Sequence, residues 1–319
     1  MFRLTLVARV ALAIAVAALA LVAGCSSSGT SSMYFNVSQR GTWSTGGQLA
    51  FASLGGNSLL YIYSITDTGG DARLLTPSNN DPAILNEGGW QPSYSPDGTL
   101  IAFVSRRGPT PLLYLMDATN GEATSLTAVT TDTGVGADSQ PSWKPGGTGL
   151  IYTSTRRAGV NDIRTIDTNG ANLVQLITDG FDYQWASYRP TDANVIVLQS
   201  DRDASNADDT DIFAYTISPT SFSKIADSTY SDGGPAWSPD GTKIAFHSNR
   251  AGDYDIWVWD TTQGPGPTNP FHLTADARSD GYPFWNADGT RIGFSRDYEL
   301  WSVLATDGSD PQQITRRFR

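Results

Sequence analysis

The sequence is poor in cysteine, histidine and positive charge. Among 319 residues there are one cysteine and two histidines. A single cysteine excludes an internal disulfide and any metal site built from several cysteines. Charged residues make up only 17%, and Asp and Glu (32) outnumber Lys and Arg (21), which gives a formal charge of −11. Because affinity for nucleic acid depends on clustered cations, this balance argues against a nucleic-acid partner.

Turn-forming and aromatic residues are abundant. The chain contains 32 glycines and 17 prolines, and 11% of its residues are aromatic. This composition is too apolar for a disordered chain and too rich in turns for a helical bundle. The length allows one large all-β domain or two ordinary domains.

The chain begins with a short apolar segment. Two cations, Arg3 and Arg9, precede an uninterrupted apolar run of 14 residues at 10–23. Such a run is short for a membrane-spanning helix and has the length of a signal-peptide core. The pattern predicts that residues 1–24 are a signal peptide, removed on export.

The apolar run ends at the only cysteine of the chain. The segment Leu21-Val-Ala-Gly-Cys25 resembles the bacterial lipobox, in which the cysteine is lipidated and becomes the first mature residue. The resemblance implies lipidation at Cys25, a flexible polar tether over 25–33, and attachment to a bacterial membrane on its periplasmic or extracellular face. An ordinary secretory signal with an incidental cysteine is the alternative.

The rest of the chain, 34–319, is one repeated pattern. Each copy has a small residue or proline, one further residue, an aromatic residue, a polar turn and a β-rich run. The six aromatic residues are Trp43, Tyr94, Trp143, Tyr188, Trp237 and Trp285, at spacings of 45 to 51 residues. Each copy has room for four short strands, and copies packed in a ring can bury the faces that a single sheet leaves open. We therefore predict an all-β, six-bladed β-propeller of four-stranded blades, with the aromatic residue packed between neighbouring blades.

The strands of each copy are bounded by turn signals. In the fifth copy, Pro239-Asp-Gly241 forms the turn before a strand at 243–248, and a strongly β-forming strand follows at 255–260. Proline fixes its own φ, aspartate bonds nearby backbone and glycine accepts a positive φ. The fourth strand is expected to end in a Leu/Ile-Thr pair, at Leu75-Thr76, Leu126-Thr127, Ile177-Thr178, Leu273-Thr274 and Ile314-Thr315.

Several segments resemble a known family. Ser95-Pro-Asp-Gly98, Ser238-Pro-Asp-Gly241, Ser248-Asn-Arg250 and Asp255-Ile-Trp257 resemble the repeat of the TolB-type propellers, also called the WD40-like Pro-Asp (PD40) repeat. The resemblance implies a propeller fold and a partner in the cell envelope. It is weak for function, because propellers carry many unrelated activities. The fourth copy has Pro190-Thr-Asp-Ala193 in place of the Pro-Asp-Gly turn, and we expect a distorted blade there.

The sequence offers little for nucleophilic catalysis. It has no Gly-x-Ser-x-Gly segment, and His247 and His272 lie within predicted strands, where a structural role is the expectation. Arginines recur after the second strand and acids recur at the start of the third. We expect ion pairs within each blade. The arginines are Arg106, Arg156, Arg202, Arg250 and Arg296, and the acids, present in four blades, are Asp162, Asp211, Asp255 and Glu299.

Acidic residues also recur just before the first strand of a blade. They are Asp138, Asp182, Asp232 and Asp280, with Tyr183 and Tyr282 beside two of them. In a propeller these segments should surround one mouth of the central channel. The carboxylates could cap their own loop backbone, bind a hard cation such as Ca²⁺, or recognise a basic peptide.

We interpret the chain as a non-enzymatic, lipid-anchored, monomeric scaffold that binds an envelope protein or peptide at this mouth. No cofactor is expected, apart from the Ca²⁺ alternative. Replacing both Asp232 and Asp280 by alanine should then leave the fold intact and abolish binding. Two alternatives stay open: a metal-dependent hydrolase or lactonase-type propeller, and a carbohydrate or cell-wall binder. In the latter, sugars would stack on Trp90, Tyr183, Trp185 and Tyr282.

Overall fold

The computed structural model describes residues 40–54, 59–76, 88–107, 109–131, 136–157, 160–203, 210–226, 229–263 and 270–315. These belong to one compact unit, Met33–Arg319. The predicted signal peptide, Cys25 and the tether lie outside the described residues. Regular structure in the described ranges is entirely β-strand, and no helix there has the length and apolarity needed to cross a membrane.

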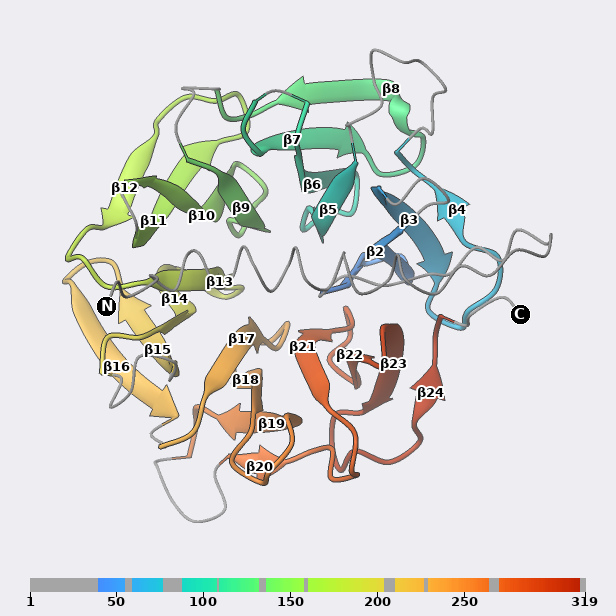
Figure 1. Ribbon diagram of the computed structural model, residues 1–319, viewed down its shortest axis with the longest axis vertical. Coiled ribbons are helices and arrows are strands. Elements are labelled where there is room, and N and C mark those ends of the chain that lie inside the picture. Colours follow the sequence, from blue (N-terminus) through green and yellow to red (C-terminus); the bar gives the residue numbers. More distant parts are fainter. Residues whose placement is uncertain are drawn as a thin grey trace, which may run out of the picture. The chain divides into compact units, whose positions relative to one another are not determined.

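The strands form six four-stranded antiparallel sheets arranged around an axis (Figure 1). We number these sheets blades 1 to 6. Blade 1 contains β1 (Thr42–Trp43), β2 (Gln48–Leu54), β3 (Leu60–Thr66) and β4 (Arg73–Leu74). Blade 2 contains β5 (Gly89–Tyr94), β6 (Leu100–Ser105), β7 (Leu112–Asp117) and β8 (Gly121–Ala128). Blade 3 contains β9 (Asp138–Trp143), β10 (Gly149–Arg157), β11 (Val160–Asp167) and β12 (Val174–Ile177). Blade 4 contains β13 (Tyr183–Arg189), β14 (Asp192–Ser200), β15 (Asp211–Thr216) and β16 (Ser221–Ala226). Blade 5 contains β17 (Asp232–Trp237), β18 (Lys243–Ser248), β19 (Asp255–Asp260) and β20 (Phe271–His272). Blade 6 contains β21 (Asp280–Trp285), β22 (Arg291–Arg296), β23 (Glu299–Leu304) and β24 (Gln312–Gln313). The predicted six-bladed propeller is confirmed.

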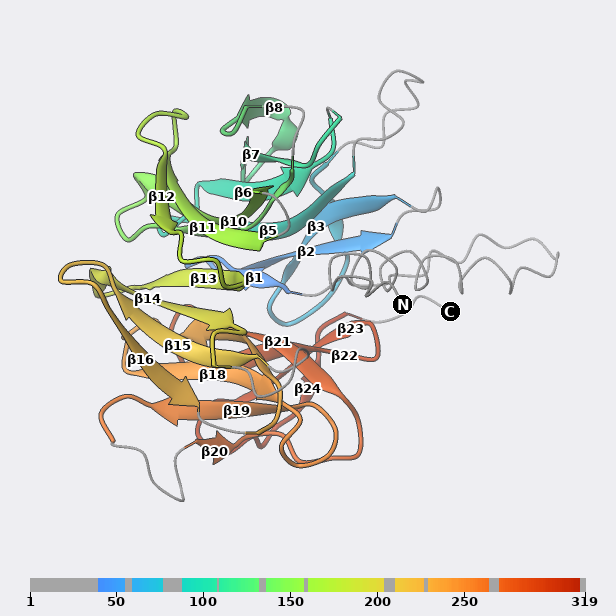
Figure 2. The same ribbon diagram turned by 60° about the vertical axis from the view of Figure 1, so that its left-hand side comes forward.

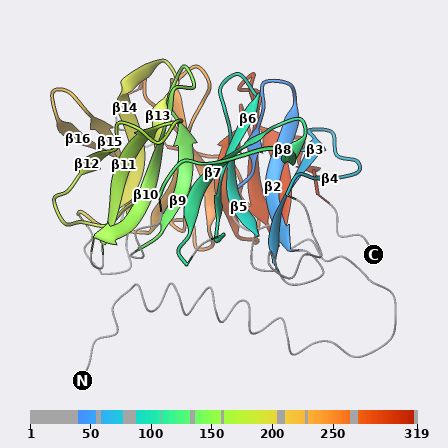
Figure 3. The same ribbon diagram turned by 90° about the horizontal axis from the view of Figure 1, so that it is seen from above.

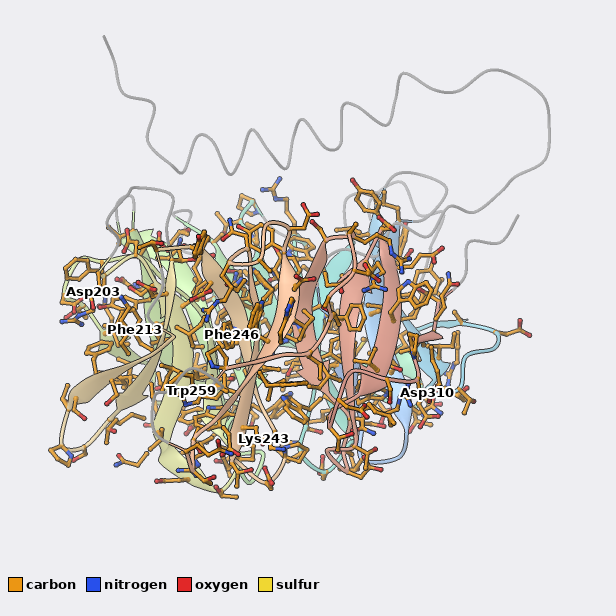
Figure 4. The ribbon with its side chains drawn as sticks, turned by 90° about the horizontal axis from the view of Figure 1, so that it is seen from below. Asp203, Phe213, Lys243, Phe246, Trp259 and Asp310 are labelled. Carbon is orange, nitrogen blue, oxygen red and sulfur yellow. The ribbon has the colours of Figure 1, made fainter. Side chains whose placement is uncertain are left out.

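The first strand of each blade lies nearest the axis, and the ring has two faces (Figures 1 and 2). Seen from its edge, the strands run from one face to the other (Figure 3). We call the face where the first strands begin the entry face. The face where each first strand turns into the second is the turn face. Asp203 follows the second strand of blade 4 and therefore lies toward the entry face. Lys243 begins the second strand of blade 5 and lies toward the turn face (Figure 4).

The core lies between neighbouring blades. Trp237, Phe246 and Trp259 of blade 5 pack against Val197 and Ile212 of blade 4 in one apolar cluster (Figure 4). Phe213 lies in the preceding cluster, which joins blades 3 and 4. Each fully buried side chain of this size contributes roughly 1.5–3 kcal/mol. The repeat aromatic residues therefore pack between blades, as the sequence indicated.

Ring closure depends on side-chain packing in the described residues. Each sheet consists of four consecutive strands, so no strand is exchanged between blades 1 and 6 there. Trp43 of blade 1 lies against Phe284 of blade 6, with 4.8 Å between the ring centroids. Leu49 and Ile314 belong to the same cluster.

The Pro-Asp-Gly turns have the expected hydrogen bonds. In blade 5 the Asp240 carboxylate accepts from the Ser238 hydroxyl (2.5 Å) and from the Thr242 N–H (3.0 Å). These bonds hold the pKa of Asp240 below its usual value, the Ser238 bond most strongly. Gly241 has φ +68°, which a glycine adopts without strain. The predicted turn chemistry is confirmed.

One local prediction is confirmed and one needs correction. Blade 4 keeps all four strands, and its expected distortion lies at the hairpin of Pro190 and Thr191, where the register shifts a second time and Arg189 pairs with Asp192. In blade 2 the predicted Leu126-Thr127 pair lies within β8, and Thr130 takes the terminal role. Its hydroxyl accepts from the Leu113 N–H at 3.0 Å, as Thr274 accepts from Ile256 in blade 5. An irregularity between β7 and β8 displaces the pattern by three residues.

Candidate functional site

The first strands share an irregularity halfway along their length. In blades 2 to 6 the register with the second strand skips two residues. The first residue of each skipped pair has a positive φ, and in four of the five blades the second is proline. Proline has no N–H for the ladder, so a bulge forms at this position. The residues with positive φ are Gln91, Gln140, Trp185, Gly234 and Tyr282, and Arg40 holds the equivalent repeat position in blade 1. We call these six residues the axial belt.

The bulges turn backbone N–H groups toward the preceding blade. The N–H of Gln140 donates to Gln91 Oε1 at 2.8 Å, and the N–H of Trp185 donates to Gln140 Oε1 at 2.9 Å. In the same way, Gly234 N–H donates to the Gln199 side chain (2.9 Å) and Tyr282 N–H donates to His247 Nδ1 (3.2 Å). A chain of hydrogen bonds thus links successive blades around the axis.

A cavity of about 420 Å³ lies on the turn-face side of the axial belt. We call it the axial pocket. Residues of all six blades line it, from the belt position to the turn between first and second strands. Its walls carry the repeat aromatic residues Trp43, Tyr94, Trp143, Tyr188, Trp237 and Trp285. Arg40 is the one charged residue among the described residues that line it. Burial lowers the pKa of Arg40 to about 10, so the side chain is cationic at neutral pH.

The acids predicted to form a site begin the first strands, on the entry face. Asp232 is fully buried, and Arg250 Nη2 donates to both of its oxygens at 3.0 and 2.9 Å. Asp280 is 1% exposed and receives two 2.5 Å bonds from Arg296. Burial raises the pKa of Asp280, and Arg296 acts in the opposite direction. Both carboxylates therefore serve ion pairs within their own blades.

The other two predicted acids also have partners nearby. Asp138 is fully buried and accepts from the Ser154 hydroxyl at 2.8 Å. Asp182 accepts two bonds from Asn161 Nδ2, at 3.0 and 2.8 Å, and one from Gln184 Nε2 at 2.9 Å. Burial raises the pKa of Asp182, and the Gln184 and Asn161 bonds oppose that rise. A ligand at this mouth would have to displace these bonds, so the predicted role of the four acids in binding stays a prediction.

The two predicted tyrosines lie in different surroundings. Tyr183 is buried in blade 4, where its hydroxyl donates to Asp179 (2.9 Å) and accepts from Arg202 (3.1 Å). Burial raises the pKa of Tyr183. Tyr282 is a belt residue, and its ring centroid is 5.3 Å from that of Trp185. Burial raises the pKa of Tyr282 as well.

Among the described side chains, which exclude that of Arg156, the predicted ion pairs between second-strand arginines and third-strand acids do not form, and Arg202 pairs with Asp179. Arg250 and Arg296 bind the first-strand acids instead. The third-strand acids bind a side chain of the fourth strand or, once, of their own strand. The observed partners are Gln175 and Arg164 for Asp162, Lys224 for Asp211, His272 for Asp255 and Gln313 for Glu299. Sequence spacing predicted the ion-pairing residues but not which neighbouring strand supplies each partner.

Both histidines have structural partners. His272 bonds to Asp255 at 2.8 Å and stacks on Trp257, with 4.0 Å between centroids. His247 lies beside the axial belt and accepts from Tyr282 through Nδ1. Burial and then the positive charge of Arg40 lower the pKa of His247 to about 4. The His247 ring is therefore neutral at physiological pH.

Metal ligands do not gather in the described ranges. No group of three or more His, Cys, Asp or Glu side chains there is placed to hold a metal ion. The Ca²⁺ alternative for the channel mouth therefore receives no support from these residues.

Sequence reasoning missed the axial pocket and Arg40. The signal was present, since the belt position is the residue before the small residue or proline of every copy. The first copy was taken to begin at Trp43, so Arg40, three residues earlier, was not recognised as part of the repeat.

Comparisons with known proteins agree with this architecture. The model of the TolB beta propeller domain (PD40) matches residues 88–217. An uncharacterized protein of Agrobacterium fabrum, Atu1656, is 29% identical over 205 residues, which are 58% of this chain and 60% of that protein. The uncharacterized peptidase YuxL of Bacillus subtilis is 26% identical over 160 residues, or 50% of this chain and 21% of the peptidase. This chain thus spans less than two thirds of either relative.

The fold also matches solved structures. TolB from Acinetobacter baumannii superimposes with a TM-score of 0.66 and 20% sequence identity, covering 85% of this chain and 64% of TolB. At this identity the likeness concerns the fold. Residues 88–217 thus match the TolB-type (PD40) propeller domain, and the structural likeness shows the same propeller fold for the ring.

Proposed function

We propose that this protein is a non-enzymatic, lipid-anchored β-propeller of the bacterial cell envelope that binds another envelope protein or a peptide. The observation that carries the proposal is the axial pocket. Its volume, about 420 Å³, falls in the range of small-ligand and side-chain sites. Every blade contributes to its wall, so it depends on the whole ring.

The pocket, and not the acidic mouth, is the binding site in this proposal. The carboxylates of Asp232 and Asp280 already hold buried guanidinium groups. The pocket walls instead offer aromatic rings, prolines and small polar side chains. Such surfaces bind peptide side chains well, because rigid aromatic groups lose little conformational entropy on contact.

The chemistry of the lining supports binding more than catalysis. A general base or acid must be a titratable side chain within hydrogen-bond reach of the substrate. Among the described lining residues the one strongly ionising side chain is Arg40, which stays protonated at neutral pH. Anchoring and export are supported by the lipobox-like segment at Cys25.

Site-specific photocrosslinking in intact cells tests the proposal. A photoreactive amino acid replaces Ala287, an exposed residue at the pocket rim, or Asp203 near the entry face as a matched control. We expect a discrete crosslinked partner from position 287 and none from 203. Filling the pocket with Ser142→Trp should abolish that crosslink. A crosslink that survives Ser142→Trp, or that forms only from 203, would overturn the proposed site.

A further inference from the structure

Arg40 differs from the arginines that bind buried carboxylates and resembles Arg189, which is held by the Gly241 carbonyl and the Trp237 ring. Arg40 is partly buried. Its Nη2 donates to the carbonyl oxygen of Pro235 at 3.0 Å, and its guanidinium carbon lies 5.8 Å from the centre of the Trp185 ring. Both partners are neutral. Arg250 and Arg296, by contrast, each bind a buried carboxylate. Within the part of the chain that the structure describes, Arg40 has no carboxylate partner.

A partly buried cation without a counter-charge is costly. Removing a guanidinium from water carries a penalty that a neutral carbonyl and an aromatic ring only partly offset. Among the described residues one of the five N–H groups of Arg40 has an acceptor, so further N–H groups are available to a planar anion. Because Arg40 lines the axial pocket, an anion can reach it from there.

The indole N–H groups in the same wall differ in their hydrogen bonds. Those of Trp143 and Trp285 donate to carbonyl oxygens of the preceding blade, at 2.8 and 3.1 Å. Among the described residues the equivalent N–H groups of Trp43 and Trp237 have no acceptor, and neither does the Ser187 hydroxyl. Neighbouring residues cover these three atoms, so a ligand in the pocket would contact Arg40 and not these donors.

The surroundings select one kind of anion. A single cation balances a single negative charge, whereas polyanions bind through several cations. The turns that surround the pocket carry Asp97, Asp240 and Asp288, whose pKa values are lowered by hydrogen bonds from Ser95, Ser238 and Thr290 respectively. These carboxylates repel a highly charged anion. The pocket walls between the axial belt and these turns are aromatic and apolar.

We propose that the axial pocket receives the carboxylate of a ligand with an aromatic or apolar body, and that Arg40 binds this carboxylate. This rests on the proposed function and gives the chemistry recognised at the same site. The carboxylate can belong to the C-terminus of a peptide or to a free small organic acid. The aromatic wall then packs on the rest of the ligand.

Calorimetric titration with defined probes tests the proposal. The probes are acetyl-Ala-Phe with a free carboxylate, the same dipeptide as its carboxamide, and 3-phenylpropionate. We expect the full-length protein to bind the acid at least tenfold more tightly than the amide. Arg40→Gln should remove that preference, Arg40→Lys should keep part of it, and Arg278→Gln, an exposed arginine, should change nothing. Equal binding of acid and amide, no binding of either, or an unchanged preference in Arg40→Gln would overturn the proposal.

Two further readouts separate the outcomes. A peptide acid that binds tenfold more tightly than 3-phenylpropionate identifies a chain terminus as the source, and equal affinities identify a small acid. His247, whose pKa is lowered by burial and then by the charge of Arg40, should show a shifted imidazole NMR signal when the acid binds but not with the amide. If the position-287 crosslink persists unchanged in Arg40→Gln, carboxylate recognition fails while the scaffold function stands.

Discussion

Arg296 and Asp280 form a buried ion pair in blade 6, joined by two hydrogen bonds of 2.5 Å. The two side chains are 4% and 0% exposed. Their strands are neighbours, so the ring depends on this pair to hold the start of β21 against β22. The same arrangement recurs in blade 5 with Arg250 and Asp232.

Removing the Asp280 charge leaves the buried Arg296 guanidinium with a single partly exposed carboxylate, Asp276, at 3.0 Å. We expect Asp280→Asn to lower the free energy of unfolding by about 3 kcal/mol. Asp310→Asn, whose carboxylate is 54% exposed against Arg291, should cost about 0–1 kcal/mol. Chemical denaturation of both variants measures the difference. Equal losses would show that burial does not govern these pairs.

The structure changes the result expected when Asp232 and Asp280 are both replaced by alanine. From the sequence alone we expected such a protein to fold normally and lose its ligand. The buried pairs predict instead that it is strongly destabilised. Loss of binding in that variant would therefore report unfolding, and it cannot locate the site.

The depressed pKa of His247 predicts a pH-dependent stability. The pKa is about 4 in the folded chain and about 6.5 when unfolded, so the unfolded chain binds more protons between these values. Stability should be complete above about pH 6.5 and fall, by up to roughly 3 kcal/mol, as the pH drops toward 4. His247→Asn should lack this component, since asparagine does not titrate. Unfolding midpoints of both proteins from neutral to acidic pH provide the measurement, and parallel curves would refute the assignment.

Gly241 is confined by a neighbouring blade as well as by its own backbone. A Cβ added at Gly241, at φ +68°, would lie 2.6 Å from Thr191 Oγ1 of blade 4. At Gly146, with φ +85°, it would meet nothing within 4 Å. In both alanine variants the left-handed conformation should lower the free energy of unfolding by about 1–2 kcal/mol. Only Gly241→Ala adds a steric clash to this loss. We expect a larger drop in melting temperature for Gly241→Ala, and the reverse order would contradict the packing.

Membrane attachment is predicted to depend on Cys25. The chain is acidic, with a formal charge of −11, so electrostatic attraction to anionic lipid cannot replace acyl chains. Cys25→Ser should move the protein from the membrane pellet to the soluble fraction on cell fractionation. Ser26→Ala, beside it in the tether, should stay in the pellet. A Cys25→Ser protein that remains in the pellet would refute lipid anchoring.

The fold was predictable because its signals repeat. Six copies of one pattern predicted blade number, turns and interblade aromatic residues, each from a local rule. Departures arose where a single copy differs, as with the hairpin at Pro190 and the terminal threonine Thr130. Partner choice was harder, because Arg250 follows a second strand that has an acid on each side, Asp232 in the first strand and Asp255 in the third.

The site was harder to predict than the fold. The recurrent acids near one mouth were the predicted site; Asp232 and Asp280 form ion pairs with Arg250 and Arg296, and the role of these acids in binding stays a prediction. Arg40 breaks the repeat, since the other belt positions hold neutral residues. Functional residues of a symmetric scaffold are best sought where the pattern is broken.

Hydrogen–deuterium exchange of the protein with its crosslink-identified partner tests the central claim that binding occurs at the axial pocket. The exposed turns at 96–99, 145–148, 239–242 and 287–290 surround the pocket on the turn face. We predict that the partner slows exchange in these turns and leaves the segments before Asp138, Asp232 and Asp280 unchanged. Protection confined to those entry-face segments would contradict the account.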